Sequence, residues 1–195
     1  MKILLISSNI ASTPYSVYPL GMGMVANALQ QAGHDVRQFD YLHSGMSTER
    51  LREKVVAFAP ALIGISIRNI DNVNMLNEVR YIQAVKDIIQ TIRANSAAPV
   101  VLGGSGFSIM PEIVRETVGA DYGISGEGEA AAVKLAAAIE AGTPPEKGCL
   151  QAPNTLVGTE IPSAQYDPAL IRFYLEKGGI ATIQTKRGCP HKCVY

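Results

Sequence analysis

The residues best suited to chemistry lie near the carboxyl-terminal end of the sequence, where Cys189 and Cys193 are separated by three positions. Thiolates are soft ligands that suit iron–sulfur clusters and zinc. The three-residue gap differs from the two-residue gap of thioredoxin motifs and zinc knuckles. Two cysteines cannot complete a cluster, and no other cysteine lies nearby. From the residues alone, iron–sulfur ligation, an incidental zinc site and a reduced, unligated pair all remain open.

The composition narrows the class of protein. The chain has 195 residues, 47% of them hydrophobic and 17% charged, with a formal net charge of +0 and no Trp. This balance gives no electrostatic bias toward nucleic acid or an anionic membrane. The longest apolar stretch is broken by Pro60, Gly64 and Ser66, so it is too short to span a membrane. We therefore expect a cytoplasmic protein without a transmembrane segment, and its few cysteines argue against a disulfide framework.

Short apolar runs alternate with amphipathic patterns over roughly the first 140 residues. The predicted strands cover 2–8, 35–41, 61–67, 99–105 and 121–125. The predicted helices cover 21–34, 47–59, 76–95 and 129–142. Strands that are apolar on both sides and alternate with helices are typical of a parallel sheet covered on both faces. The predicted fold is α/β, a doubly wound parallel five-stranded sheet in flavodoxin-like order, which binds ligands at the carboxyl ends of its strands.

The composition changes after about residue 143, where prolines and turn residues become frequent. We assign 1–145 to the first domain and 146–179 to a linker with a hairpin and a short helix. Residues 180–195 are expected to begin a second domain, with a strand over 180–188 that leads into the cysteines. Cys149, in the turn-rich segment, is interpreted as a buried or incidental thiol.

The stretch TKRGCPHKCVY, at 185–195, resembles the opening of the radical S-adenosylmethionine (SAM) family motif, Cys-x3-Cys-x-aromatic-Cys. That family places the motif after the first strand of a partial β/α barrel. The resemblance implies that Cys189 and Cys193 are two of three thiolate ligands of a [4Fe–4S] cluster and that Tyr195 lies beside the cofactor. SAM would bind the open iron, and His191 would not be a ligand. We expect the chain to be an N-terminal fragment of a longer enzyme, unable by itself to hold a catalytic cluster.

Four earlier stretches resemble, in order and spacing, the cobalamin-binding domain of cobalamin-dependent radical SAM enzymes. They are YPLGMGMVANALQQAGHDVRQFD, ALIGISI, PVVLGGSGFSIMPE and DYGISGEGEAA. The likeness runs through most of residues 1–140 and implies a Rossmann-like domain that binds cobalamin. Together with the cysteine motif it covers nearly the whole chain.

The glycine pair Gly103–Gly104, followed by Ser105, ends the fourth predicted strand, where missing Cβ atoms let a ligand approach the backbone. The resemblance implies that this pair makes room for the dimethylbenzimidazole tail of cobalamin. A glycine turn required by the chain alone is the alternative. Ser66 falls where the family's Ser-x-Leu motif bonds the tail, although Arg68 replaces the leucine.

The stretch SGEGE places Gly126, Glu127 and Gly128 at a predicted helix start, which suits a polar or phosphate group of the cofactor. Alternatively, Glu127 and Glu129 simply stabilise the amino terminus of the helix.

The cobalt ligand departs from the related pattern Asp-x-His-x-x-Gly. In the stretch DYLHSG, at 40–45, Leu42 occupies the histidine position and His43 comes one residue late, so His43 is a doubtful ligand. Arg68, Asn69 and Asn72 are candidates for contact with corrin amides or the cobalt face. Asx turns and helix capping are the alternative roles of the asparagines.

Taken together, these resemblances imply a cobalamin-dependent radical SAM methyltransferase. In that family a SAM-derived radical abstracts hydrogen from a carbon, and methylcobalamin delivers the methyl group. The implied partners are a small-molecule or lipid-like substrate, natural products included, and an external electron donor of the flavodoxin or ferredoxin type. A cyclisation or rearrangement enzyme, a stand-alone corrinoid-binding module and a domain that has lost its corrinoid are the alternatives.

Overall fold

A computed structural model describes residues 1–13, 15–72, 74, 76–152 and 163–187. The core is a six-stranded parallel sheet in the order β2-β1-β3-β4-β5-β6. Its strands are β1 (Lys2–Ser7), β2 (Asp35–Asp40), β3 (Leu62–Ser66), β4 (Val100–Gly103), β5 (Tyr122–Ser125) and β6 (Gly148–Gln151). The predicted doubly wound α/β fold and the order of its first five strands are confirmed.

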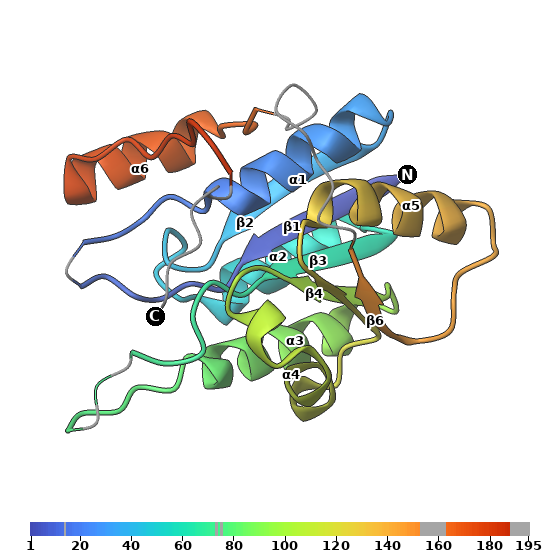
Figure 1. Cartoon of the computed structure of the whole chain (residues 1–195), viewed down its shortest axis with the longest axis horizontal. Helices are drawn as coiled ribbons and strands as arrows, with labels where there is room; N and C mark the ends of the chain where they lie inside the picture. The colour runs from blue at the N-terminus through green and yellow to red at the C-terminus, as the bar shows by residue number, and fades with distance from the viewer. Residues whose placement is uncertain (14, 73, 75, 153–162, 188–195) are drawn as a thin grey trace, which may run out of the picture.

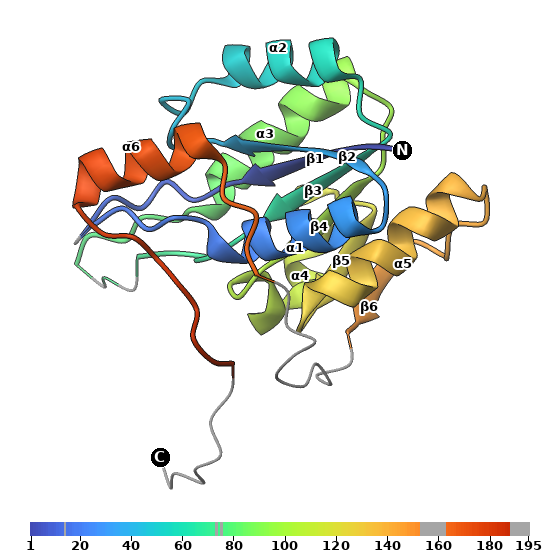
Figure 2. The same cartoon turned by 90° about the horizontal axis from the view of Figure 1, so that it is seen from above.

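Two layers of helices cover the sheet (Figures 1 and 2). The helices are α1 (Leu20–Gln31), α2 (Thr48–Phe58), α3 (Ile82–Asn95), α4 (Pro111–Val118), α5 (Gly128–Glu140) and α6 (Pro168–Gly178), with a short 3₁₀ helix, η1 (Phe107–Ile109). One apolar core lies between the sheet and α2, α3 and α4, and a second lies between the sheet and α1, α5 and α6. Along β1, Leu4 and Ile6 enter the first core and Ile3 and Leu5 enter the second. Alternate burial on both faces is the reason why β1 reads as a continuous apolar run.

The sixth strand, β6, was not predicted. It lies in the segment assigned to the linker and pairs in parallel with β5, joining Gly123 to Cys149 and Ile124 to Leu150. Because β6 is parallel to its neighbour, it does not form a hairpin with β5. A Cβ atom at Gly123 would collide with the Phe107 ring and would lie 2.8 Å from the Cys149 sulfur, so this glycine makes room for both side chains. Cys149 is a half-buried, free thiol whose pKa is raised by burial, which agrees with a packing role.

Three further details differ from the sequence prediction. Helix α3 begins at Ile82 rather than at 76, because Asn72 and Asn74 hold the preceding loop by accepting backbone hydrogen bonds. Helix α4 begins with Pro111 at its first position, in a stretch where the sequence analysis places no element. Residues 180–187 form no strand, so the strand predicted over 180–188 is wrong in its described part. An extended segment becomes a strand only by pairing with a neighbour, and 180–187 pair with no strand in the described chain.

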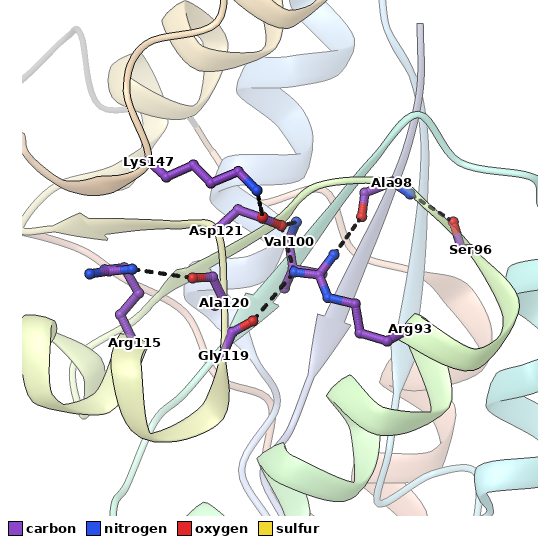
Figure 3. A network of polar contacts seen from close by, with 9 residues as sticks. All are labelled: Arg93, Ser96, Ala98, Val100, Arg115, Gly119, Ala120, Asp121 and Lys147. Carbon is purple, nitrogen blue, oxygen red and sulfur yellow. Dashed lines mark hydrogen bonds and ion pairs between the residues drawn. The ribbon is translucent and has the colours of Figure 1, made fainter.

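A polar network secures the sheet around Asp121, just before β5 (Figure 3). The Asp121 carboxylate accepts hydrogen bonds from Arg93 at 2.6 Å and from the Val100 amide at 2.8 Å, and it pairs with Lys147 at 2.7 Å. Arg93 also donates to the Ala98 carbonyl at 3.2 Å. The network joins α3, β4, β5 and the segment before β6 at the end of the sheet opposite the strands' carboxyl ends.

We predict that Asp121→Asn destabilises the protein. Burial raises the pKa of Asp121, but hydrogen bonds from Lys147, Arg93 and the Val100 amide outweigh burial and hold this pKa below its ordinary value of 3.8. The stabilisation is therefore complete above pH 3.8 and is lost as the pH falls through the lowered pKa of the folded state. The substitution should lower the free energy of unfolding by about 1–3 kcal/mol at neutral pH.

Urea unfolding at neutral pH and across the acid range measures both effects. Asp35→Asn, the same change at an exposed carboxylate, is the control and should have little effect. An Asp121→Asn protein as stable as the wild type at neutral pH would contradict the stabilising role of the network.

Candidate functional site

An apolar cavity of about 350 Å³ lies between the sheet and helices α1 and α5. Strand side chains that share one face of the sheet form its floor, and α1 and α5 form its walls. The apolar lining includes Ile3, Leu5, Leu62, Val101, Ile124, Met22, Val25, Leu29, Ala132 and Leu135. The cavity also includes residues at the carboxyl ends of β3, β4 and β5, where the sequence predicts ligand binding. Its size is that of a small-molecule site.

Most of the predicted binding residues lie together in the lining of this cavity. They are Ser66, Gly103, Gly104, Ser105, Gly126, Glu127 and Gly128. They come from the ends of three neighbouring strands and from the start of α5. Their contact with a ligand stays a prediction, but the sheet places them around one space.

The two glycines at the end of β4 are needed for different physical reasons. A Cβ atom at Gly103 would meet only the Ile124 carbonyl oxygen, at 3.7 Å, so the absence of a side chain there leaves space in the cavity. Gly104 has a φ of +102°, and a Cβ atom there would lie 2.5 Å from the Ile67 carbonyl oxygen. Gly104 is therefore required by the chain itself, whereas Gly103 keeps the cavity open.

Arg68 and Asn69 are predicted binding residues that do not line the cavity. They lie in the loop after β3, where the Ser105 hydroxyl donates to the Arg68 carbonyl at 3.0 Å. The Ser105 side chain, at the end of β4, therefore holds the backbone of this loop. The Arg68 side chain itself is exposed. Asn72, farther along, holds its own loop by accepting a hydrogen bond from the Val79 amide at 3.0 Å, which is the Asx-type role.

The carboxyl end of β2 is closed by helix α6 rather than by a histidine. The Asp40 carboxylate is buried and accepts hydrogen bonds from the Tyr174 hydroxyl at 3.0 Å and from the His43 amide at 2.7 Å. The His43 ring contacts the Phe173 ring edge to face, with centroids 4.9 Å apart. His43 is not part of the cavity lining, so its side chain belongs to the contact with α6.

Burial dominates the electrostatics of this contact. It raises the pKa of the Asp40 carboxyl, and hydrogen bonds from the His43 amide, Ser7 and Tyr174 oppose that rise. Burial and the nearby Asp40 carboxylate also raise the pKa of Tyr174, whereas Arg68 lowers it. The Tyr174 hydroxyl therefore stays protonated at neutral pH and acts as a donor.

Sequence reasoning missed Arg187 as a site residue. This side chain comes from the carboxyl-terminal segment and reaches the rim of the cavity. Its guanidinium donates to Glu129 at 2.5 Å and pairs with Glu127 at 3.3 Å. Arg187 and Glu129 are 58 positions apart, so no local pattern could have paired them.

The predicted cluster ligands Cys189 and Cys193, and Tyr195 beside them, lie outside the described residues. No group of three or more potential metal-ligating side chains is found within the part of the chain that the structure describes. In the same described ranges, no helix is both long and apolar enough to cross a membrane.

Comparison with known proteins places these features in context. The B12 binding domain family matches residues 6–136. The chain is 33% identical to tryptophan 2-C-methyltransferase of Streptomyces laurentii, over 72% of this chain and 23% of that protein. It is 27% identical to an uncharacterized methyltransferase of Pyrococcus horikoshii, over 100% of this chain and 45% of that protein. The chain thus spans less than half the length of either relative.

Solved structures show the same likeness. The radical SAM methyltransferase TsrM from Kitasatospora setae, solved with cobalamin and a [4Fe–4S] cluster bound, matches with a TM-score of 0.68 and 32% identity. The match covers 72% of this chain and 26% of TsrM. The cobalamin-dependent enzyme OxsB matches with a TM-score of 0.52 and 17% identity, over 70% of this chain and 19% of OxsB, which supports the fold alone.

We predict that Tyr174→Phe destabilises the contact between α6 and the sheet. The substitution leaves one oxygen of the buried Asp40 carboxylate without its hydroxyl donor, which should lower the free energy of unfolding by about 1–3 kcal/mol. Urea unfolding measures this loss. Tyr15→Phe, the same change at a side chain that is 48% exposed, is the control. Equal stabilities of the Tyr174→Phe and Tyr15→Phe proteins would show that the hydrogen bond contributes nothing.

We also predict that the two glycines respond differently to alanine. Gly104→Ala places a Cβ atom against the Ile67 backbone at a positive φ, so it should lower the free energy of unfolding by about 1–3 kcal/mol. Gly103→Ala adds a methyl group in open space and should change stability by less than about 0.5 kcal/mol. Urea unfolding of both variants tests the difference, and a larger loss for Gly103→Ala would reverse the assignment.

Proposed function

The chain belongs to the B12 binding domain family, and from this membership we propose that it is the cobalamin-binding part of a cobalamin-dependent radical SAM methyltransferase. The observation that carries the proposal is the apolar cavity, which gathers the residues of the family-like stretches around one space at the carboxyl ends of the strands. The similarity to the Streptomyces laurentii and Kitasatospora setae methyltransferases supports the type of reaction.

The cavity suits the nucleotide tail of cobalamin. The tail ends in an aromatic base, which matches a space lined mainly by aliphatic side chains. Gly103 leaves room for this base against β4, and Ser66 and Ser105 offer hydroxyl groups at the strand ends. Gly126 and Gly128, at the start of α5, bring the backbone close to the rim. These residues therefore fit the cofactor, and we propose that they hold its tail.

We propose that the tail in the cavity leaves cobalt without a nitrogen ligand from this chain. Leu42 stands where related domains place a histidine, and the His43 ring lies against Phe173. The Asp40 carboxylate, which would orient such a histidine, is engaged by Tyr174 instead. Arg68 and Asn69, in the loop after β3, remain candidates for the corrin amides or the cobalt face.

In the proposed division of labour, residues 1–145 together with β6 form the cobalamin-binding unit, the rest of 146–179 connects it to the next domain, and 180–195 begin the radical SAM domain. Cys189 and Cys193 are the proposed thiolate ligands of a [4Fe–4S] cluster, with Tyr195 beside it. When bound, cobalamin supplies a transferable methyl group, and the cluster with SAM supplies the radical chemistry that activates the substrate carbon.

We propose a small organic substrate and an external electron donor of the flavodoxin or ferredoxin type in a cytoplasmic enzyme. Support for the substrate class comes from the Kitasatospora setae enzyme, which has been solved with tryptophan as its substrate. The described cavity is assigned to the cofactor, so substrate selection is expected outside it.

We predict that the chain retains hydroxocobalamin through desalting and shows a base-off visible spectrum, because the base of the tail leaves cobalt to enter the cavity. Gly103→Val places a branched side chain in that space and should weaken retention by about tenfold or more, since overpacking costs about 1–3 kcal/mol. His43→Ala, which changes a side chain outside the cavity, is the control and should bind as the wild type does. Loss of corrinoid from the wild-type chain, or a base-on spectrum, would contradict the proposed function.

A further inference from the structure

Glu129 combines deep burial with a carboxylate oxygen that has no partner. It lies in the first turn of α5, is only 5% exposed and lines the cavity. One oxygen, Oε1, accepts the hydrogen bond from Arg187, and the other, Oε2, is buried without a hydrogen-bond partner among the described residues. A buried acceptor that stays unpaired is costly, so proteins rarely leave one.

Arg187 and the helix fix how this carboxylate is oriented. The guanidinium binds Oε1 at 2.5 Å and lies 3.3 Å from the Met24 sulfur on α1, so it bridges the two walls of the cavity. The amino terminus of α5 favours negative charge nearby. A carboxylate oxygen can only accept hydrogen bonds, so Oε2 presents an acceptor to the cavity.

We propose that Glu129 Oε2 accepts a hydrogen bond from an O–H or N–H donor of the ligand in the cavity and that Arg187 is the residue that positions it. This inference rests on the proposed function, because cobalamin is taken as the ligand. Cobalamin carries such donors in two places, the ribose hydroxyls of its nucleotide tail and the amide groups of its corrin ring. The binding site then extends beyond residues 6–136, which match the family, to Arg187 in the carboxyl-terminal segment.

Glu129→Gln is the sharpest variant because it keeps the shape of the side chain. Arg187 requires an oxygen on its side of the amide, so the NH₂ group must face the cavity. A donor then meets the ligand's donor where the wild type presents an acceptor. Arg187→Met is the second variant, because it removes the positioning group without altering α5. Glu140→Gln, the same change on the same helix at an exposed carboxylate outside the lining, is the matched control.

Titration of the 195-residue chain with hydroxocobalamin, followed by the corrinoid's visible absorbance, gives the affinities. Glu129→Gln should bind about ten- to a hundredfold more weakly than the wild type, as expected for loss of a hydrogen bond to a charged group. Arg187→Met should also bind more weakly, and Glu140→Gln should bind as the wild type does. Because Arg187→Met leaves the buried Glu129 carboxylate without its counter-ion, its ligand-free unfolding midpoint should fall. Circular dichroism at the titration temperature should show every variant folded, which separates weaker binding from loss of structure.

Dicyanocobinamide, which lacks the nucleotide tail but keeps the corrin amides, distinguishes the two donor sources. A loss confined to hydroxocobalamin assigns the donor to the tail, and an equal loss with both probes assigns it to a corrin amide. Unchanged hydroxocobalamin affinity in both Glu129→Gln and Arg187→Met would overturn the inference and leave the proposed function standing. A wild-type chain that fails to bind hydroxocobalamin would overturn the proposed function and the inference with it.

Discussion

The structure depends on an apolar space that its own side chains do not fill. On the face of the sheet covered by α1 and α5, the core residues surround a cavity of about 350 Å³ instead of closing on one another. Protein interiors are otherwise packed to the density of organic crystals, so an unfilled apolar volume carries a cost in stability. A ligand with an aromatic portion recovers that cost by making the missing contacts. The opposite face, under α2, α3 and α4, forms a large apolar core.

The segment beyond the family match contributes to the same end of the sheet. Helix α6 places Tyr174 on the Asp40 carboxylate, and the chain after it places Arg187 on Glu129. Each contact joins an acidic residue at the rim of the sheet to a hydrogen-bond donor more than fifty positions later in the sequence. Leu42, at the position of the cobalt-binding histidine in related domains, packs against the apolar core. The Arg187–Glu129 ion pair adds charged groups to the rim of the cavity. Arg187, in the segment proposed to begin the second domain, is therefore also part of the cavity lining.

The parts of this structure that could be predicted depend on local patterns. The first five strands follow from apolar runs such as 61–67 and 99–105. The grouping of residues around the cavity follows because the carboxyl ends of parallel strands meet at one edge of the sheet. Strand β6 was missed because four residues among prolines and turn residues carry little signal. No strand forms over 180–187, the described part of the predicted strand, because an apolar run shows propensity whereas a strand also needs a partner to pair with. The Arg187–Glu129 pair and the Tyr174–Asp40 bond depend on tertiary contacts that no spacing in the sequence records.

Electron paramagnetic resonance of cob(II)alamin bound to this chain tests the central claim most directly. A nitrogen ligand below cobalt splits each cobalt line into three, whether the nitrogen comes from the cofactor's own base or from a histidine. The account predicts unsplit lines, because the base of the tail is proposed to enter the cavity and His43 lies against Phe173. Three-line splitting would show that the base or a histidine binds cobalt, and it would contradict the assignment of the cavity to the tail or the role given to His43.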